Sequence, residues 1–234
     1  MITIVADMIM FRKRVPPDRS FDPMSLSFDN RIRVDPPHAK GEATVCRILD
    51  ATGELLAARG YDALTTNRIA EAAGINIATL YRYYPNKQSI LVAMSQRDIR
   101  AWLEAATAGV DSIRLGGDWR FEMGQLIAFA AQRRNNQPGG KTMRLAMRLL
   151  PELQPFAREE AFVTSSLLAN ILVSQWELDL AHAQQISRIA YEIANSVLDL
   201  SLFDKSPDDQ VWLVEAQAAV CRYLAPHLDR ERPV

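Results

Sequence analysis

The hydrophobic positions that follow residue 42 repeat with the spacing of an α-helix. From Ala43 onward apolar residues recur at intervals of three and four, as on one helix face, and they are Val45, Ile48, Ala51, Leu55 and Ala58. Gly60 comes next, and glycine commonly ends a helix. The pattern therefore predicts a first helix that stops at Gly60.

Two short helices are predicted before Pro85. A hydroxyl at Thr65 can accept a hydrogen bond from a free amide in the first turn of the first one. Gly74 suits the left-handed conformation of a tight corner between helices, and Asn76 can cap the second helix. The segment Thr65 to Lys87 is therefore predicted to be a helix-turn-helix.

The two faces of this segment differ in chemistry. The residues predicted to face inward are Ile69, Ala70 and Ala73 on the first helix and Leu80 and Tyr84 on the second. Thr79, Arg82 and Tyr83 are predicted to face outward, and Ile77 and Ala78 lie at the N-terminal end of the second helix. Arginine and tyrosine contact phosphates or guanine, and small apolar groups contact thymine methyls. The outward face is therefore predicted to contact DNA.

The chain beyond Pro85 reads as long helices, which makes the predicted fold class all-α. Few alternating runs could form strands, and breaks are expected near Gly116 and Gly117, Pro138 to Gly140, Pro151, Pro155 and Pro207. The last two helices carry apolar stripes, one made of Ile186, Ile189, Ile193, Val197 and Leu200 and the other of Val211, Val214, Ala218 and Cys221. Such a pair can form an internal hairpin or the seam of a dimer.

Composition and charge narrow the classes of protein. Hydrophobic residues make up 48% and charged residues 24% of the 234 residues, as in a globular protein. The net charge of -1 supplies no general attraction for nucleic acid, so binding to DNA must depend on local cations. Cys46 and Cys221 are interpreted as reduced thiols of a cytoplasmic protein with no metal, no cofactor and no membrane span. No catalytic motif is recognised, so the chain is predicted not to be an enzyme.

The first 38 residues are expected to form an unpacked, disordered arm. Prolines and charges are scattered there without a sustained period. Two other interpretations of this segment are open. The basic cluster at Arg12 to Arg14 could contact DNA, or translation could start at Met24.

The segment from Ala43 to Met94 resembles the DNA-binding domain of the TetR family, the tetracycline repressor-like regulators. The matching positions are Gly60–Tyr61, Thr65–Thr66, Ile69–Ala70, Ala73–Ile75, Thr79–Tyr84 and Asn86–Leu91. Asn76, Ala78 and Tyr84 depart from the residues most common there, which leaves the operator sequence open.

The resemblance implies roles for individual residues and a division into domains. By position, Thr66, Tyr81 and Lys87 become phosphate contacts, and Asn67, Ile77, Ala78 and Thr79 become base-facing residues. Residues 39–97 would form a three-helix DNA-binding domain, and residues 98–234 a helical domain for ligand binding and dimerisation. A homodimer is implied that docks two recognition helices on a pseudo-palindromic operator of double-stranded DNA and is released by a small-molecule effector.

Large apolar side chains of the second domain are candidates for the effector site. The candidates are Trp119, Phe129, Met143, Met147, Phe162 and Trp176, while ordinary core packing is the competing interpretation for each. The competing function for the whole chain is a helical small-molecule binding protein, or an enzyme built in a helical bundle, in which the helix-turn-helix is only a packing corner.

Overall fold

The computed structural model describes residues 39–203 and 209–229, and the predicted N-terminal arm and the break at Pro207 lie outside these ranges. All regular elements in the described ranges are helical, which confirms the predicted all-α class. They are α2 (Ala39–Arg59), α3 (Thr66–Ala72), α4 (Ile77–Tyr83), α5 (Lys87–Arg114), α6 (Trp119–Asn136), α7 (Gly140–Leu149), the 3-10 helix η1 (Pro151–Leu153), α8 (Gln154–Trp176), α9 (Leu180–Phe203) and α10 (Asp209–Leu228).

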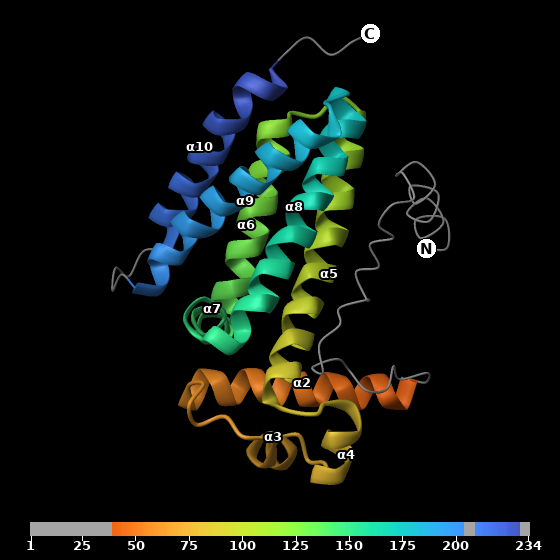
Figure 1. Cartoon of the computed structure of the whole chain (residues 1–234), viewed down its shortest axis with the longest axis vertical. Helices are drawn as coiled ribbons and strands as arrows, with labels where there is room; N and C mark the ends of the chain where they lie inside the picture. The colour runs from red at the N-terminus through yellow and green to blue at the C-terminus, as the bar shows by residue number, and fades with distance from the viewer. Residues whose placement is uncertain (1–38, 204–208, 230–234) are drawn as a thin grey trace.

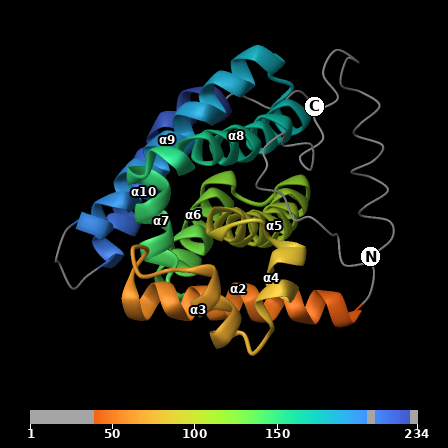
Figure 2. The same ribbon diagram turned by 60° about the horizontal axis from the view of Figure 1, so that its bottom comes forward.

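The helices form a small base beneath a larger bundle (Figures 1 and 2). In the base, α2 lies across the molecule, and α3 and α4 lie beneath it. Above it, α5, α6, α8, α9 and α10 run along the long axis, and α9 packs against both α8 and α10. The predicted boundary between residues 97 and 98 lies inside α5, which begins beside α4 and continues into the bundle.

The base and the bundle share one apolar core. Buried residues of α2 to α5, among them Ile48 and Leu56, belong to the same cluster as Met147 of α7, Leu153 of η1 and Phe156 of α8. Burial of such side chains stabilises a fold by roughly 1.5 to 3 kcal/mol each. The core against which α3 and α4 pack therefore includes residues from the second half of the chain.

The helix breaks agree with the sequence in part. The expected breaks at Gly116 and Gly117 and at Pro138 to Gly140 are present. The expected break near Pro155 is present as well, since η1 ends at Leu153 and α8 begins at Gln154. Pro155 lies in the first turn of α8, where its missing amide hydrogen has no helical partner to lose. The break between α8 and α9 was not predicted, and there Glu177 takes a left-handed conformation with φ 53°.

The backbones of α2 and of the α6–α7 corner meet at two glycines. A Cβ atom at Gly139 would lie 2.5 Å from the carbonyl oxygen of Gly53 and 2.6 Å from Cβ of Leu56. A Cβ atom at Gly53 would lie 2.7 Å from the carbonyl oxygen of Pro138. The base and the bundle thus touch at a point that admits no side chain on either backbone.

Replacing Gly139 with alanine tests this close approach, and Gly60→Ala is the matched control. Both glycines have φ +72°, but a Cβ atom at Gly60 meets nothing within 4 Å. The conformational cost is therefore shared, and Gly139→Ala should lower the free energy of unfolding by about 1 to 3 kcal/mol more than Gly60→Ala, measured by urea denaturation. Equal losses would mean that the contact has no energetic role.

Candidate nucleic-acid interface

The corner between α3 and α4 is fixed by caps that the sequence predicted. Thr65 Oγ1 accepts a hydrogen bond from the Arg68 amide at 3.3 Å, and Asn76 Oδ1 accepts one from the Ala78 amide at 2.8 Å. Gly74 has φ 63°, the left-handed conformation expected at the corner. These contacts satisfy amides at the start of both short helices and set the angle between them.

The buried face of the corner also agrees with the sequence. Ile69, Leu80 and Tyr84 have no exposed surface, and Ala70 and Ala73 are 3% and 7% exposed. Both alanines are small enough to allow a close approach of the two helices. This face packs into the core shared with α7 and α8.

The prediction that Tyr83 faces outward is wrong, since its side chain is only 5% exposed. The helix α4 ends at Tyr83, so Leu80 and Tyr83, which are three positions apart, share its inner face. Tyr84 then reaches the core from an extended backbone with φ -131°. The guanidinium of Arg82 lies 5.3 Å from the centre of the Tyr83 ring, which therefore supports Arg82 from beneath.

The other candidates for DNA contact differ in exposure. Asn67, Ala78, Tyr81 and Arg82 are exposed, whereas Thr66, Ile77, Thr79 and Lys87 are half-buried. Ile77 packs partly against the core, so only part of its side chain is available at the surface. Apart from Tyr83, the candidates thus retain accessible atoms on or next to α3 and α4.

A hydrogen bond that the sequence did not reveal joins the two short helices. The hydroxyls of Thr66 and Tyr81 lie 3.0 Å apart, so one donates to the other. Because the pair connects the start of α3 with the middle of α4, it holds the Tyr81 ring in place. Both residues were assigned to phosphate by position, and their pairing places two hydroxyls together at the surface.

Lys87 is held over an aromatic ring at the start of α5. Its Nζ lies 4.0 Å from the centre of the Tyr61 ring. The Tyr61 hydroxyl donates to Glu152 of η1 at 3.3 Å and accepts from Gln88 Nε2 at 3.5 Å. Burial and the charge of Glu152 raise the pKa of Tyr61 to about 12, so the phenol keeps its proton at neutral pH. Glu152 of η1 thereby helps to hold the Tyr61 ring, and through it the Lys87 ammonium, in place.

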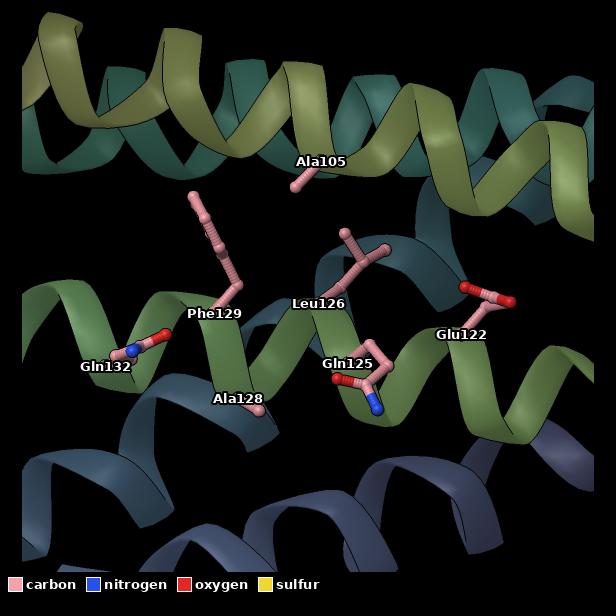
Figure 3. A pocket seen from close by; sticks show the side chains of 7 residues that line it. All are labelled: Ala105, Glu122, Gln125, Leu126, Ala128, Phe129 and Gln132. Atoms are coloured by element: carbon pink, nitrogen blue, oxygen red, sulfur yellow. The ribbon is translucent and has the colours of Figure 1, made fainter.

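Two cavities in the bundle are lined by residues of the described ranges. The α5–α6 pocket of about 200 Å³ is lined by Ala105 of α5 and by residues of α6, among which Phe129 points toward α5 (Figure 3). The central cavity of about 180 Å³ lies among α5 to α10 and shares Leu126 and Phe129 with the pocket. Its wall also includes Met143 and the arginines Arg134 and Arg144.

Four of the six predicted ligand residues line neither cavity. Trp119 and Trp176 hold the end of α10, because their indole nitrogens donate to Asp229 and to the Leu228 carbonyl at 3.1 and 2.9 Å. Met147 belongs to the core shared with the base, and Phe162 is 49% exposed. Only Phe129 and Met143 are found at a cavity, since aromatic or sulfur character alone does not distinguish a cavity wall from packed core.

Metal and membrane sites are not indicated by the part of the chain that the structure describes. Its histidines, cysteines and carboxylates form no group of three that could hold a metal ion. Its helices are also too short or too polar to cross a bilayer.

The known proteins that resemble this chain in sequence are bacterial transcriptional regulators. The family described as bacterial regulatory proteins, tetR family, matches residues 48–94. The HTH-type transcriptional regulator YvkB of Bacillus subtilis is 48% identical over 48 residues, which are 20% of this chain and 25% of that protein. The HTH-type transcriptional repressor KstR of Rhodococcus jostii is 44% identical over 52 residues, which are 22% and 24%. The match thus spans about a quarter of the length of these relatives, which are regulators rather than enzymes.

The similarity of fold extends over most of the chain. The structure of the fatty acid degradation regulator FadR from Bacillus halodurans superposes with a TM-score of 0.60 at 18% identity. It covers 80% of this chain and 96% of that one. At this identity the likeness concerns the fold alone.

Removal of the Lys87 ammonium tests the interface without knowledge of the operator. Lys87→Ala should weaken binding to any duplex and reduce the slope of log affinity against log salt by about one per chain, because one counterion fewer is released. Arg114→Ala removes a cation at the far end of the same helix and should leave the slope unchanged. Fluorescence anisotropy over a salt series measures both, and an unchanged slope for Lys87→Ala would remove this residue from the interface.

Proposed function

We propose that this chain, whose residues 48–94 match the tetR family of bacterial regulatory proteins, is a sequence-specific, DNA-binding transcriptional regulator. It acts as a homodimeric repressor and leaves a pseudo-palindromic operator when a small, fairly apolar ligand binds in the bundle. The observation that carries the proposal is the exposed face of α4, held by the Asn76 cap, the Gly74 corner and the buried Leu80.

Reading of DNA is assigned to α4 and its neighbours. Ala78 and Thr79, near the N-terminal end of α4, face the bases, because this end of a recognition helix enters the major groove first. Arg82, supported by the Tyr83 ring, binds guanine or a phosphate. The Thr66 and Tyr81 hydroxyls and the Lys87 ammonium bind phosphates on either side.

Dimerisation is assigned to α9 and α10. The buried face of α10 is formed by Ala216, Val220 and Leu224, whereas Val211 and Val214 of the predicted stripe are each 51% exposed. On α9, Ile189 and Leu200 are 38% and 44% exposed although Ile186 is buried. Internal packing therefore leaves apolar positions of both stripes uncovered, and a second copy would cover them in a four-helix bundle.

The ligand is assigned to the central cavity, and α7 is assigned to carry its effect to the base. Met143 and Arg144 of α7 line the cavity, while Met147 on the same helix is buried in the core against which α3 and α4 pack. The corner before α7 also touches α2 at Gly139 and Gly53. A ligand that shifts α7 would change the orientation of α4 and so lower affinity for the operator. The similar fold of FadR from Bacillus halodurans, a fatty acid degradation regulator, supports the proposal of an apolar ligand.

Selection of bound DNA from a random pool tests the proposed function. A pseudo-palindrome should be enriched whose half-sites lie about 34 Å apart, one helical turn, or a multiple of this. A variant with both Arg82→Ala and Tyr81→Phe should bind it about tenfold or more weakly, because a base or phosphate contact and a hydroxyl are lost. Arg114→Ala should bind as the parent chain does. No enriched sequence, or unchanged affinity of the double variant, would refute the proposal.

A charge within the uncovered stripe tests the dimer. Leu200→Glu should raise the dimer dissociation constant by about a hundredfold, because two carboxylates would be buried near each other across a twofold seam. Leu115→Glu is the matched control, since Leu115 is 89% exposed and lies on neither α9 nor α10. Sedimentation equilibrium measures both variants. A parent chain that stays monomeric, or a Leu200→Glu variant that dimerises like the control, would contradict the assignment.

A further inference from the structure

We propose that the central cavity takes an amphipathic carboxylate, with its anionic head at Arg134 and its apolar body directed away from the DNA-binding base. The inference rests on the proposed function in that it names the chemistry of the regulatory ligand. It is argued from the charges, the donors and the apolar wall of the cavity.

An ion cluster beside the polar end of the cavity contains more guanidinium groups than carboxylates, and two of its arginines, Arg134 and Arg144, line the cavity. Asp199 of α9 is almost fully buried and forms ion pairs with three arginines: Arg134 of α6 at 2.6 Å, Arg144 of α7 at 2.9 Å and Arg148 of α7 at 3.2 Å. Glu160, which also lines the cavity, is the second acid near this cluster. The cluster thus has three guanidinium groups for two carboxylates, and Asp199 alone is shared by all three.

Asp199 binds Arg134 less completely than Arg144, because Arg134 donates to it through one nitrogen only. Asp199 binds Arg144 with both oxygens, at 2.9 and 3.0 Å, and although burial opposes the charge, this hydrogen bonding raises the pKa of Arg144. For Arg134 the balance is the opposite, since burial and the charge of Arg144 lower its pKa despite Asp199. Arg134 is only 8% exposed and lines the cavity, so its remaining donors can meet a ligand there.

The neighbouring groups favour a ligand that accepts hydrogen bonds. Burial and the charge of Glu160 raise the pKa of Tyr191, so this phenol stays protonated at the cavity wall. Glu160 itself already accepts a hydrogen bond from Ser95 at 2.7 Å. A second pair, Arg133 with Asp98 at 2.6 Å, is balanced within itself. A cationic ligand would instead face the buried guanidinium of Arg134, which is unfavourable in a site of low polarity.

The rest of the cavity wall is apolar, and it extends from the arginines in one direction, away from the base. Its wall includes Trp102 of α5, Met123 and Leu126 of α6, Leu168 of α8 and Val220 of α10. Along α6, Leu126 and Met123 lie about two and three turns from Arg134, which is followed by the corner that contacts α2. The polar end is therefore next to α7 and the base, and the apolar end extends into the bundle. A carboxylate held there would sit where it can shift α7.

Binding to the protein without DNA separates this inference from the proposed function. The probes are alkyl chains of eight and twelve carbons that carry a carboxylate, a hydroxyl or an ammonium head, measured by isothermal titration calorimetry at pH 7. At one or both lengths the carboxylate should bind about tenfold or more tightly than the alcohol, and the ammonium most weakly. Equal binding of acid and alcohol, tighter binding of the ammonium, or no binding of any probe would overturn the inference.

Variants identify the residue responsible. Arg134→Gln should lose about tenfold or more in affinity for the acid and leave the alcohol unchanged. Arg148→Gln is the matched control, because Arg148 shares Asp199 but is 42% exposed and does not line the cavity, so it should keep the preference for the acid. Thermal unfolding monitored by circular dichroism verifies that both variants fold. A preference that survives in Arg134→Gln, or is lost equally in the control, would contradict the assignment.

A second variant keeps the test independent of the stability of Arg134→Gln. Glu160→Gln removes the anion that competes for the arginines, so it should tighten binding of the acid by severalfold and leave the alcohol unchanged. Weaker binding of the acid in this variant would contradict the inference. If the acid binds as expected but no DNA is recognised by the free protein, the proposed function fails and the ligand class stands.

Discussion

The apolar core against which the recognition helix α4 packs is built from both halves of the chain. Leu80 and Tyr84 of the helix-turn-helix are buried in the same cluster as Met147 of α7 and Phe156 of α8. The orientation of α4 therefore depends on the position of α7, and α5 cannot act as a loose linker because it is continuous from the base into the bundle. In a close-packed interior, a shift on one side of such a cluster has to be accommodated on the other.

The position of α7 is set by two kinds of contact on its two sides. Met147 packs into the shared core, and Arg144 is held by both oxygens of Asp199 at the wall of the cavity. The Gly53 and Gly139 contact adds a point where the backbones leave no spare room. A charge that enters the cavity would change the balance around Asp199, and α7 is the element that connects this change with the DNA-reading face.

Local signals in the sequence predicted the helix-turn-helix well, and distant contacts explain what they missed. The caps of Thr65 and Asn76 and the corner at Gly74 follow from neighbouring residues, and all are confirmed. Tyr83 was predicted to face outward because Leu80 and Tyr84, four positions apart, would share the inner face of one continuous helix, whereas α4 ends at Tyr83. The cluster around Asp199 joins residues that are 51 to 65 positions apart, and no periodicity reveals such pairings.

The central claim is that two copies present their α4 helices to successive major grooves of one DNA site. It is tested most directly by the distance between spin labels at residue 71, introduced as Glu71→Cys after Cys46 and Cys221 are replaced by serine. Glu71 is exposed on α3, which packs against α4, and it is not among the residues assigned to DNA, so the label leaves the proposed interface intact. With the DNA-bound protein, double electron–electron resonance should give one narrow distance near the half-site spacing of about 34 Å or a multiple of it, allowing for the label arms and the offset of α3 from α4. The absence of dipolar coupling, or a broad distribution with no population near this spacing, would contradict the account.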